Sequence, residues 1–159
     1  MAKFKKNESL NNLSASLENY LETIAIVKRE KKYARIGAIA KALNVKSSSV
    51  NIAMKLLVEN NLVVHEKYGH VDLTPQGEAL ALEVKEKHNI LYNFLSKLLF
   101  VNDEIADQEA CEIEHSISIE TVHKIERLHL LLKKYFLKND EDTLNLKKYL
   151  EEMNTIEKL

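Results

Sequence analysis

The scarcity of glycine and proline is the strongest constraint on the fold, because the chain holds only three Gly and one Pro among 159 residues. Their near absence, beside many Leu, Lys, Glu and Ala residues, predicts a mainly α protein with little room for an extended sheet. With 45% hydrophobic residues, the chain can bury a core as one domain or two small ones. It has one cysteine, no apolar signal core and no membrane-length apolar run, so we expect a cytoplasmic protein with no disulfide and no membrane partner.

The charges are segregated along the chain, although the net charge is only −1. Residues 28–67 hold nine Lys and Arg against three Glu, whereas residues 101–123 hold seven Asp and Glu with no Lys or Arg. A basic segment suits a polyanion such as nucleic acid, and an acidic segment suits a cation. The two segments therefore predict two different partners.

The order of elements in residues 1–74 predicts a winged helix-turn-helix domain. Ser16 is expected to cap a helix with apolar residues at i, i+3, i+4 and i+7, and a short helix follows over 37–43. Three serines at 47–49 are expected to cap another helix over 50–60. Two short helices joined by a tight turn form a helix-turn-helix.

A small β-hairpin wing completes this domain, because residues 62–73 alternate apolar and polar side chains around a turn at Gly69. In such a domain the N-terminal end of the serine-capped helix enters the major groove, and the wing lies near the DNA backbone. Winged-helix modules also mediate protein contacts, but the basic charge of this segment favours DNA. The predicted DNA-contacting residues are Arg35, Lys46, Ser47, Ser48, Ser49, Asn51 and Lys55, with Lys67, Tyr68 and His70 on the wing.

The second half of the chain predicts helices only. Thr74 and Pro75 begin a long helix that is expected to reach about Phe100, and the polar break at 101–103 and Ser118 begin two more. A last amphipathic helix packs either on its own domain or on a partner subunit, and the sequence leaves both open. We therefore expect a DNA-binding domain at 1–74, a linking helix with an all-α metal-binding and dimerisation domain at 75–137, and a C-terminal helical extension at 138–159.

Three potential metal ligands lie within one helical turn of the acidic segment. Cys111, Glu114 and His115 stand at i, i+3 and i+4, so a thiolate, a carboxylate and an imidazole project from one face. Gathering such groups in a negative segment is unfavourable without a cation. The alternative is a solvated acidic helix with a half-buried cysteine and a surface histidine.

Other residues are ambiguous when taken alone. His88 falls inside the apolar stripe of the linking helix, where it is either a hydrogen-bonded core histidine or a ligand. Asn19 and Glu22 are one turn apart and lie off the apolar stripe of the first helix, so they face either solvent or a site shared with another helix.

A family resemblance rests on several stretches taken together. They are Ser16–Glu22, Val45–Val50, Leu73–Gly77, Lys87 with His88, and Glu109–His115. With these stretches in this order, the chain resembles the metal-dependent transcriptional repressors typified by the diphtheria toxin repressor and the manganese transport regulator, in a short two-domain form. The resemblance implies a metal ion that bridges the first, linking and acidic helices, and a homodimer that binds a palindromic operator in double-stranded DNA. The implied metal ligands are Glu22, His88, Cys111, Glu114 and His115.

The sequence departs from the family pattern at three positions. Asn19 stands where the iron regulators place Met and the manganese regulators place Asp, which makes it an unusual ligand. Tyr92 and Asp107 occupy positions where the iron regulators use Glu and His for a second ion. The implied metal site therefore departs from the family pattern at Asn19, and the family's second metal site departs from it at Tyr92 and Asp107.

The expected function is a metal-dependent transcriptional repressor of genes for metal-ion uptake. We expect no enzyme, because a closed set of side-chain ligands leaves little room for a substrate and no general base stands beside it. The thiolate of Cys111 favours Fe(II) over Mn(II), although the oxygens of Asn19 and Glu22 tolerate manganese. The alternative is a winged-helix regulator without metal control, which responds to an organic ligand or a protein partner.

Overall fold

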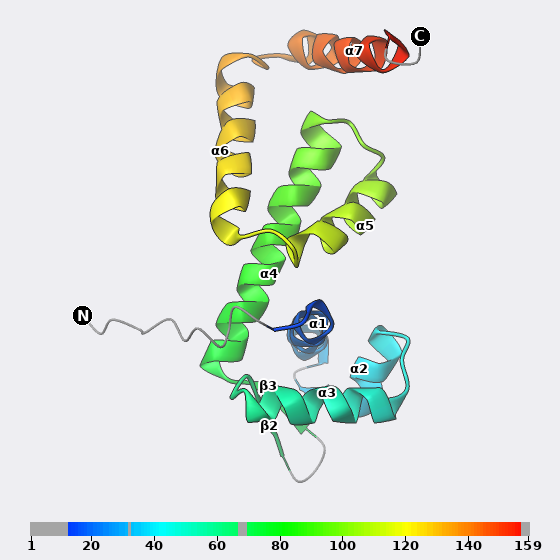
Figure 1. The fold of residues 1–159 in the computed structure, drawn as a ribbon, viewed down its shortest axis with the longest axis vertical. Helices are drawn as coiled ribbons and strands as arrows, with labels where there is room; N and C mark the ends of the chain where they lie inside the picture. Colours follow the sequence, from blue (N-terminus) through cyan, green and yellow to red (C-terminus); the bar gives the residue numbers. More distant parts are fainter. Residues whose placement is uncertain (1–12, 32, 67–69, 157–159) are drawn as a thin grey trace, which may run out of the picture. The chain divides into compact units, whose positions relative to one another are not determined.

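The computed structural model describes residues 13–31, 33–66 and 70–156, and helices make up most of it (Figure 1). The chain divides into two units, Met1–Lys85 and Glu86–Leu159, and the division falls within the helix α4. The first unit contains α1 (Ala15–Lys31), β1 (Ala34–Arg35), α2 (Ile36–Ala42), α3 (Ser47–Glu59), β2 (Val63–His65), β3 (His70–Leu73) and the start of α4 (Pro75–Asn93). The second contains the end of α4, the π-helical turn η2 (Phe94–Leu98), α5 (Asp103–Glu114), α6 (Ile119–Tyr135) and α7 (Asp140–Ile156).

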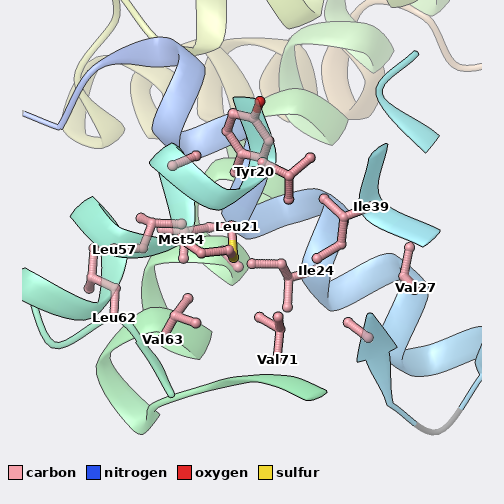
Figure 2. Close-up of a cluster of buried hydrophobic side chains, with 14 of the residues drawn as sticks. Tyr20, Leu21, Ile24, Val27, Ile39, Met54, Leu57, Leu62, Val63 and Val71 are labelled. Atoms are coloured by element: carbon pink, nitrogen blue, oxygen red, sulfur yellow. The ribbon is translucent and has the colours of Figure 1, made fainter. Parts of the chain in front are cut away.

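Side chains from every helix and strand of the first unit meet in one apolar core (Figure 2). Leu21 and Ile24 of α1, Ile39 of α2 and Leu57 of α3 are fully buried there. Burying one such side chain stabilises the fold by about 1.5–3 kcal/mol relative to leaving it in water. The apolar stripe expected on the first helix is therefore the side that α1 turns toward the core.

The small sheet has the strand order β1-β3-β2, and both pairs are antiparallel. The pairing of β2 with β3, with Val64 opposite Asp72, forms the wing. The expected turn at Gly69 lies outside the described residues. Strand β1 was not expected from the sequence, because it is two residues long and exists through the pairing of Ala34 with Val71. The predicted fold class, a winged helix-turn-helix domain followed by an all-α domain, is confirmed.

Two helix starts differ from the sequence prediction. Ser14, not Ser16, precedes α1, and the backbone N–H of Leu17 donates to its Oγ at 3.4 Å. Ser47–Ser49 form the first turn of α3, and Lys46 occupies the N-cap position. Three consecutive serines define no unique cap, and the start is set by the turn before it, where Val45 N donates to the Ala40 carbonyl at 3.0 Å.

Thr74 and Pro75 begin α4 as predicted, since the backbone N–H of Gly77 donates to Thr74 Oγ1 at 3.0 Å. The expectation of one regular helix to Phe100 is wrong in its last turns, because the α-helix ends at Asn93 and continues as η2. A π-helical turn inserts one residue, which shifts the side chains that follow. Phe100 then adopts φ 56° and ends the segment.

The second unit has its own apolar core. Ile90 and Leu91 of α4, Ala110 of α5 and Val122 of α6 are buried together. The predicted helix starts at the polar break 101–103 and at Ser118 are confirmed, because the side chains of Asn102 and Ser118 each accept a backbone N–H in the first turn. None of the described helices combines the length and the apolar character that crossing a membrane requires.

Replacing Gly77 by Ala tests the close packing at the start of α4. A Cβ at this position would overlap the backbone carbonyl of Leu62, which also accepts the N–H of Thr74 at 3.0 Å. We expect Gly77→Ala to lower the free energy of unfolding by about 2–3 kcal/mol through overpacking, as measured by urea denaturation.

Gly37→Ala is the matched control, because a Cβ at Gly37 of α2 meets no described atom within 4 Å. Its stability should be unchanged or raised by up to about 1 kcal/mol, since alanine favours a helix over glycine. Equal effects of the two substitutions would contradict the packing explanation.

Candidate metal centre and DNA-binding surface

The last turn of α5 gathers three potential ligands at one point. One ligand atom each from Cys111, Glu114 and His115 lies within 4.8 Å of the others. Glu114 is fully buried, and Cys111 and His115 are half-buried. A thiolate, a carboxylate and an imidazole at this spacing form a donor set suited to a divalent transition metal.

The two carboxylate oxygens of Glu114 differ in their surroundings. Oε2 lies 2.9 Å from Nδ1 of His88. Oε1 is buried and has no hydrogen-bond partner among the described residues, although Nε2 of His115 lies 3.4 Å away. An unsatisfied buried carboxylate oxygen is costly. A cation at this position would resolve the conflict, so the residues present fit a metal ion.

His88 lies between two carboxylates. Its Nδ1 contacts Glu114, and its Nε2 lies 3.2 Å from Oδ1 of Asp107. The hydrogen bond with Glu114 raises the pKa of His88 above its usual value; burial lowers it, and the nearby charges raise it further. Because histidine ligates metals in its neutral form, an ion at His88 would compete with a proton. The sequence left two interpretations of His88 open, a core histidine or a metal ligand. In the structure His88 lies beside the cluster of Cys111, Glu114 and His115, in contact with Glu114.

Tyr92 and Asp107, at the positions that differ from the iron regulators, make other contacts. The Tyr92 hydroxyl donates to Oδ1 of Asp103 at 3.0 Å, and the ammonium of Lys97 lies 3.3 Å from the same oxygen. These contacts lower the pKa of Asp103. Tyr92 is thus hydrogen-bonded to the ion pair of Lys97 and Asp103, and Asp107 contacts His88.

Asn19 and Glu22 belong to the first unit and are half-buried on α1. Glu22 lines a cavity of about 320 Å³ beside α1 and α4, together with Ala25, Lys28, Ala81 and Lys85. The structure brings His88, Cys111, Glu114 and His115 together within the second unit. The contribution of Asn19 and Glu22 to the same site stays a prediction.

Sequence reasoning missed Lys87 as a neighbour of this site. Its ammonium donates to the backbone carbonyl of Glu114 at 3.0 Å, and the residue is only 8% exposed. The available signal was its position, because Lys87 stands three residues after Val84 and four before Leu91 on the apolar stripe of α4.

The predicted DNA-contacting residues of α3 form an exposed surface. Lys46 precedes the helix, and Ser47, Ser48, Ser49, Asn51 and Lys55 are all exposed. Ile52 lies among them with 66% of its surface exposed, and sequence reasoning did not single it out. An apolar side chain on the outer face of such a helix suits the methyl group of thymine.

A second group of predicted contacts lies where β1 meets β3. Arg35 Nη2 lies 3.3 Å from Nε2 of His70, the ring of Tyr33 stacks on His70 at 4.6 Å, and the guanidinium of Arg35 lies 5.1 Å from the Tyr33 ring. Lys67 and Tyr68 lie outside the described residues.

A winged helix-turn-helix joined to an all-α unit with a metal-ligand cluster defines the class of metal-responsive DNA-binding regulators. The family model described as "Iron dependent repressor, N-terminal DNA binding domain" matches residues 12–71, and "Iron dependent repressor, metal binding and dimerisation domain" matches residues 74–138. The chain therefore belongs to the family of iron-dependent repressors, whose members are metal-dependent DNA-binding transcriptional regulators and not enzymes.

Individual relatives agree with this assignment. The HTH-type transcriptional regulator MntR of Geobacillus thermodenitrificans is 37% identical over 110 residues, which cover 69% of this chain and 77% of the relative. MntR of Bacillus pumilus is 33% identical over 132 residues, which cover 83% and 88% of the two chains.

Solved structures show the same fold. IdeR of T. acidophilum is 31% identical with a TM-score of 0.62, over 70% of this chain and 53% of that one. The manganese regulator SloR is 26% identical with a TM-score of 0.64, over 70% of this chain and 52% of that one. This chain thus spans about half the length of these solved chains.

Glu114→Gln tests the metal centre, because it removes the charge of the buried carboxylate with little change in shape. We expect Co(II) binding, followed by absorption spectroscopy, to weaken more than about 100-fold, beyond the 10–100-fold typical of losing a residue that only supports a ligand. Glu112→Gln is the matched control, because Glu112 is exposed on the same helix. Equal losses in both variants would indicate a general effect of charge and not ligation.

Proposed function

We propose that the protein is a metal-activated repressor that works as a homodimer in the cytoplasm and controls genes for metal-ion uptake. The observation that carries the proposal is the cluster of Cys111, Glu114 and His115 around the unsatisfied Oε1 of Glu114. We further propose that Glu22 and His88 complete the ligand set, with the amide of Asn19 as an additional neutral oxygen.

The proposed mechanism is linkage between metal binding and DNA binding. A metal ion that holds ligands from α1, α4 and α5 fixes the arrangement of the DNA-binding domains of the dimer, and DNA must tighten metal binding by the same factor. A coupling of about 1–3 kcal/mol is sufficient to change occupancy. We assign DNA binding to residues 1–74, metal binding and dimerisation to 75–137, and the C-terminal helix to an extension at 138–159.

The proposed operator is palindromic, because a twofold dimer presents two copies of α3 to two half-sites. In this arrangement Lys46, Arg35 and Lys55 attract phosphates, and the residues with short polar side chains, Ser47, Ser48, Ser49 and Asn51, approach the base edges. Lys67, Tyr68 and His70 act from the wing. The exposed Ile52 supplies an apolar contact that distinguishes thymine.

Iron is the proposed physiological metal, with manganese second. The thiolate of Cys111 favours ions beyond Mn(II) in the Irving–Williams order. Among these ions Fe(II) is proposed, because cells keep free Co, Ni, Cu and Zn scarce. The oxygens of Asn19 and Glu22 tolerate manganese, and the similar solved protein SloR is described as a manganese regulator. The thiolate of Cys111 is therefore the reason for proposing iron over manganese.

The test is DNA binding with and without metal. Duplexes selected from a random pool by the metal-loaded protein are titrated anaerobically with the chelated, Fe(II)-loaded and Mn(II)-loaded forms, with fluorescence anisotropy as the readout. Metal should tighten binding by about 5- to 150-fold. Cys111→Glu replaces the one soft ligand with a hard one and should shift the larger response from Fe(II) to Mn(II).

An unchanged metal preference in Cys111→Glu would show that the thiolate does not set selectivity. Identical DNA binding by the chelated and metal-loaded wild type would favour the alternative of a winged-helix regulator without metal control.

The proposed DNA surface is tested through its salt dependence. Lys46→Ala should weaken binding to all duplexes alike and reduce the slope of log K against log salt by about one, because one phosphate contact is lost. Lys124→Ala is the control, since Lys124 is exposed on α6 and pairs with Glu120. A change of base preference with an unchanged slope would instead assign Lys46 to base recognition.

A further inference from the structure

Lys87 is a buried lysine in direct contact with the helix that carries the metal ligands. It is 8% exposed, and its Nζ donates to the carbonyl oxygen of Glu114 at 3.0 Å, across 27 positions of sequence. Lysine is rarely buried unless its charge is compensated. Its stem could cover apolar surface with the ammonium in water, but this hydrogen bond is itself buried.

The contact supplies what the end of α5 lacks. The last carbonyl groups of a helix have no intrahelical donors and form the negative end of the helix dipole, so a cation there is stabilising. The last turn of α5, all of which is described, holds no Lys or Arg. Lys87 provides the missing cation from another helix.

Two consecutive residues of α4 hold the same residue of α5. Lys87 binds the main-chain carbonyl of Glu114, and His88 lies 2.9 Å from its carboxylate Oε2. Two contacts at opposite ends of one residue restrict both its backbone and its side chain. The remaining oxygen, Oε1, is then directed toward His115.

We propose that Lys87 is a positioning residue of the metal centre: its ammonium fixes the last turn of α5 so that Glu114 and His115 present their ligand atoms together. The inference rests on the proposed function, because it concerns the same metal ion. Lys87 does not ligate the metal, and its positive charge alone would weaken cation binding. A gain in metal affinity when the charge is removed is therefore the result expected if positioning is unimportant.

The experiment compares Lys87→Met with Lys87→Arg and with the control Lys124→Met. Lys124 is exposed in the same unit, so its loss removes the same charge without the buried contact. The readouts are the Co(II) dissociation constant, the Cys111–Co(II) charge-transfer band, and amide hydrogen exchange at residues 113–116 of the metal-free proteins.

We expect Lys87→Met to weaken Co(II) binding by about 10- to 100-fold, as is usual for residues that orient ligands, and to change the charge-transfer band. Exchange at residues 113–116 should become faster, Lys87→Arg should recover part of both losses, and Lys124→Met should match the wild type. If Lys87→Met fails to fold, Lys87→Gln, which keeps a donor without the charge, takes its place.

Equal or tighter Co(II) binding by Lys87→Met, unchanged exchange at residues 113–116, or no recovery in Lys87→Arg would each overturn the proposal. Failure of the wild type to bind Co(II) would refute the proposed function instead. The exchange rates of the metal-free proteins would then still decide whether Lys87 holds the end of α5.

Discussion

The second unit must accommodate one fully buried carboxylate, that of Glu114. It is fully buried at the end of an acidic helix, where an uncompensated charge is strongly unfavourable. Two residues of α4 contact Glu114: the imidazole of His88 lies beside its carboxylate Oε2, and the ammonium of Lys87 donates to its backbone carbonyl. Because α4 begins in the first unit and ends in the second, the residues that stabilise Glu114 lie on the helix that joins the two units.

The position of His88 suits a regulatory site more than a structural one. Both of its ring nitrogens lie within hydrogen-bond distance of carboxylates, and both can donate only when the imidazole is protonated. The imidazolium then supplies one positive charge to the acidic cluster without a metal ion. Domains that depend on a structural zinc ion lack such a substitute and unfold without the metal. The proposed switch requires a site of this kind, one that can lose its metal ion while the domain stays folded.

The features predicted correctly from sequence are those that neighbouring residues determine. Thr74 and Pro75 start α4, and Asn102 starts α5, because a capping side chain and its N–H partner lie within three residues. Strand β1 and the contact of His88 with Glu114 depend on partners 37 and 26 positions away, so no local pattern reveals them. The ligand spacing on α5 was visible, but the burial of Glu114 was not.

The candidate DNA-binding face of α3 and the candidate metal centre differ in whether the same residues serve both the fold and the function. On α3, Val50 and Leu57 are buried, whereas Ser48, Ile52 and Lys55 are exposed on the other side. Opposite faces of one helix thus carry the core residues and the proposed DNA contacts, and an exposed residue can vary while the core stays intact. At the metal centre no such division exists, because Glu114 is both a buried residue and a candidate ligand. The proposed metal site is therefore subject to two constraints at once, and we expect metal selectivity to change most readily at the half-buried Cys111.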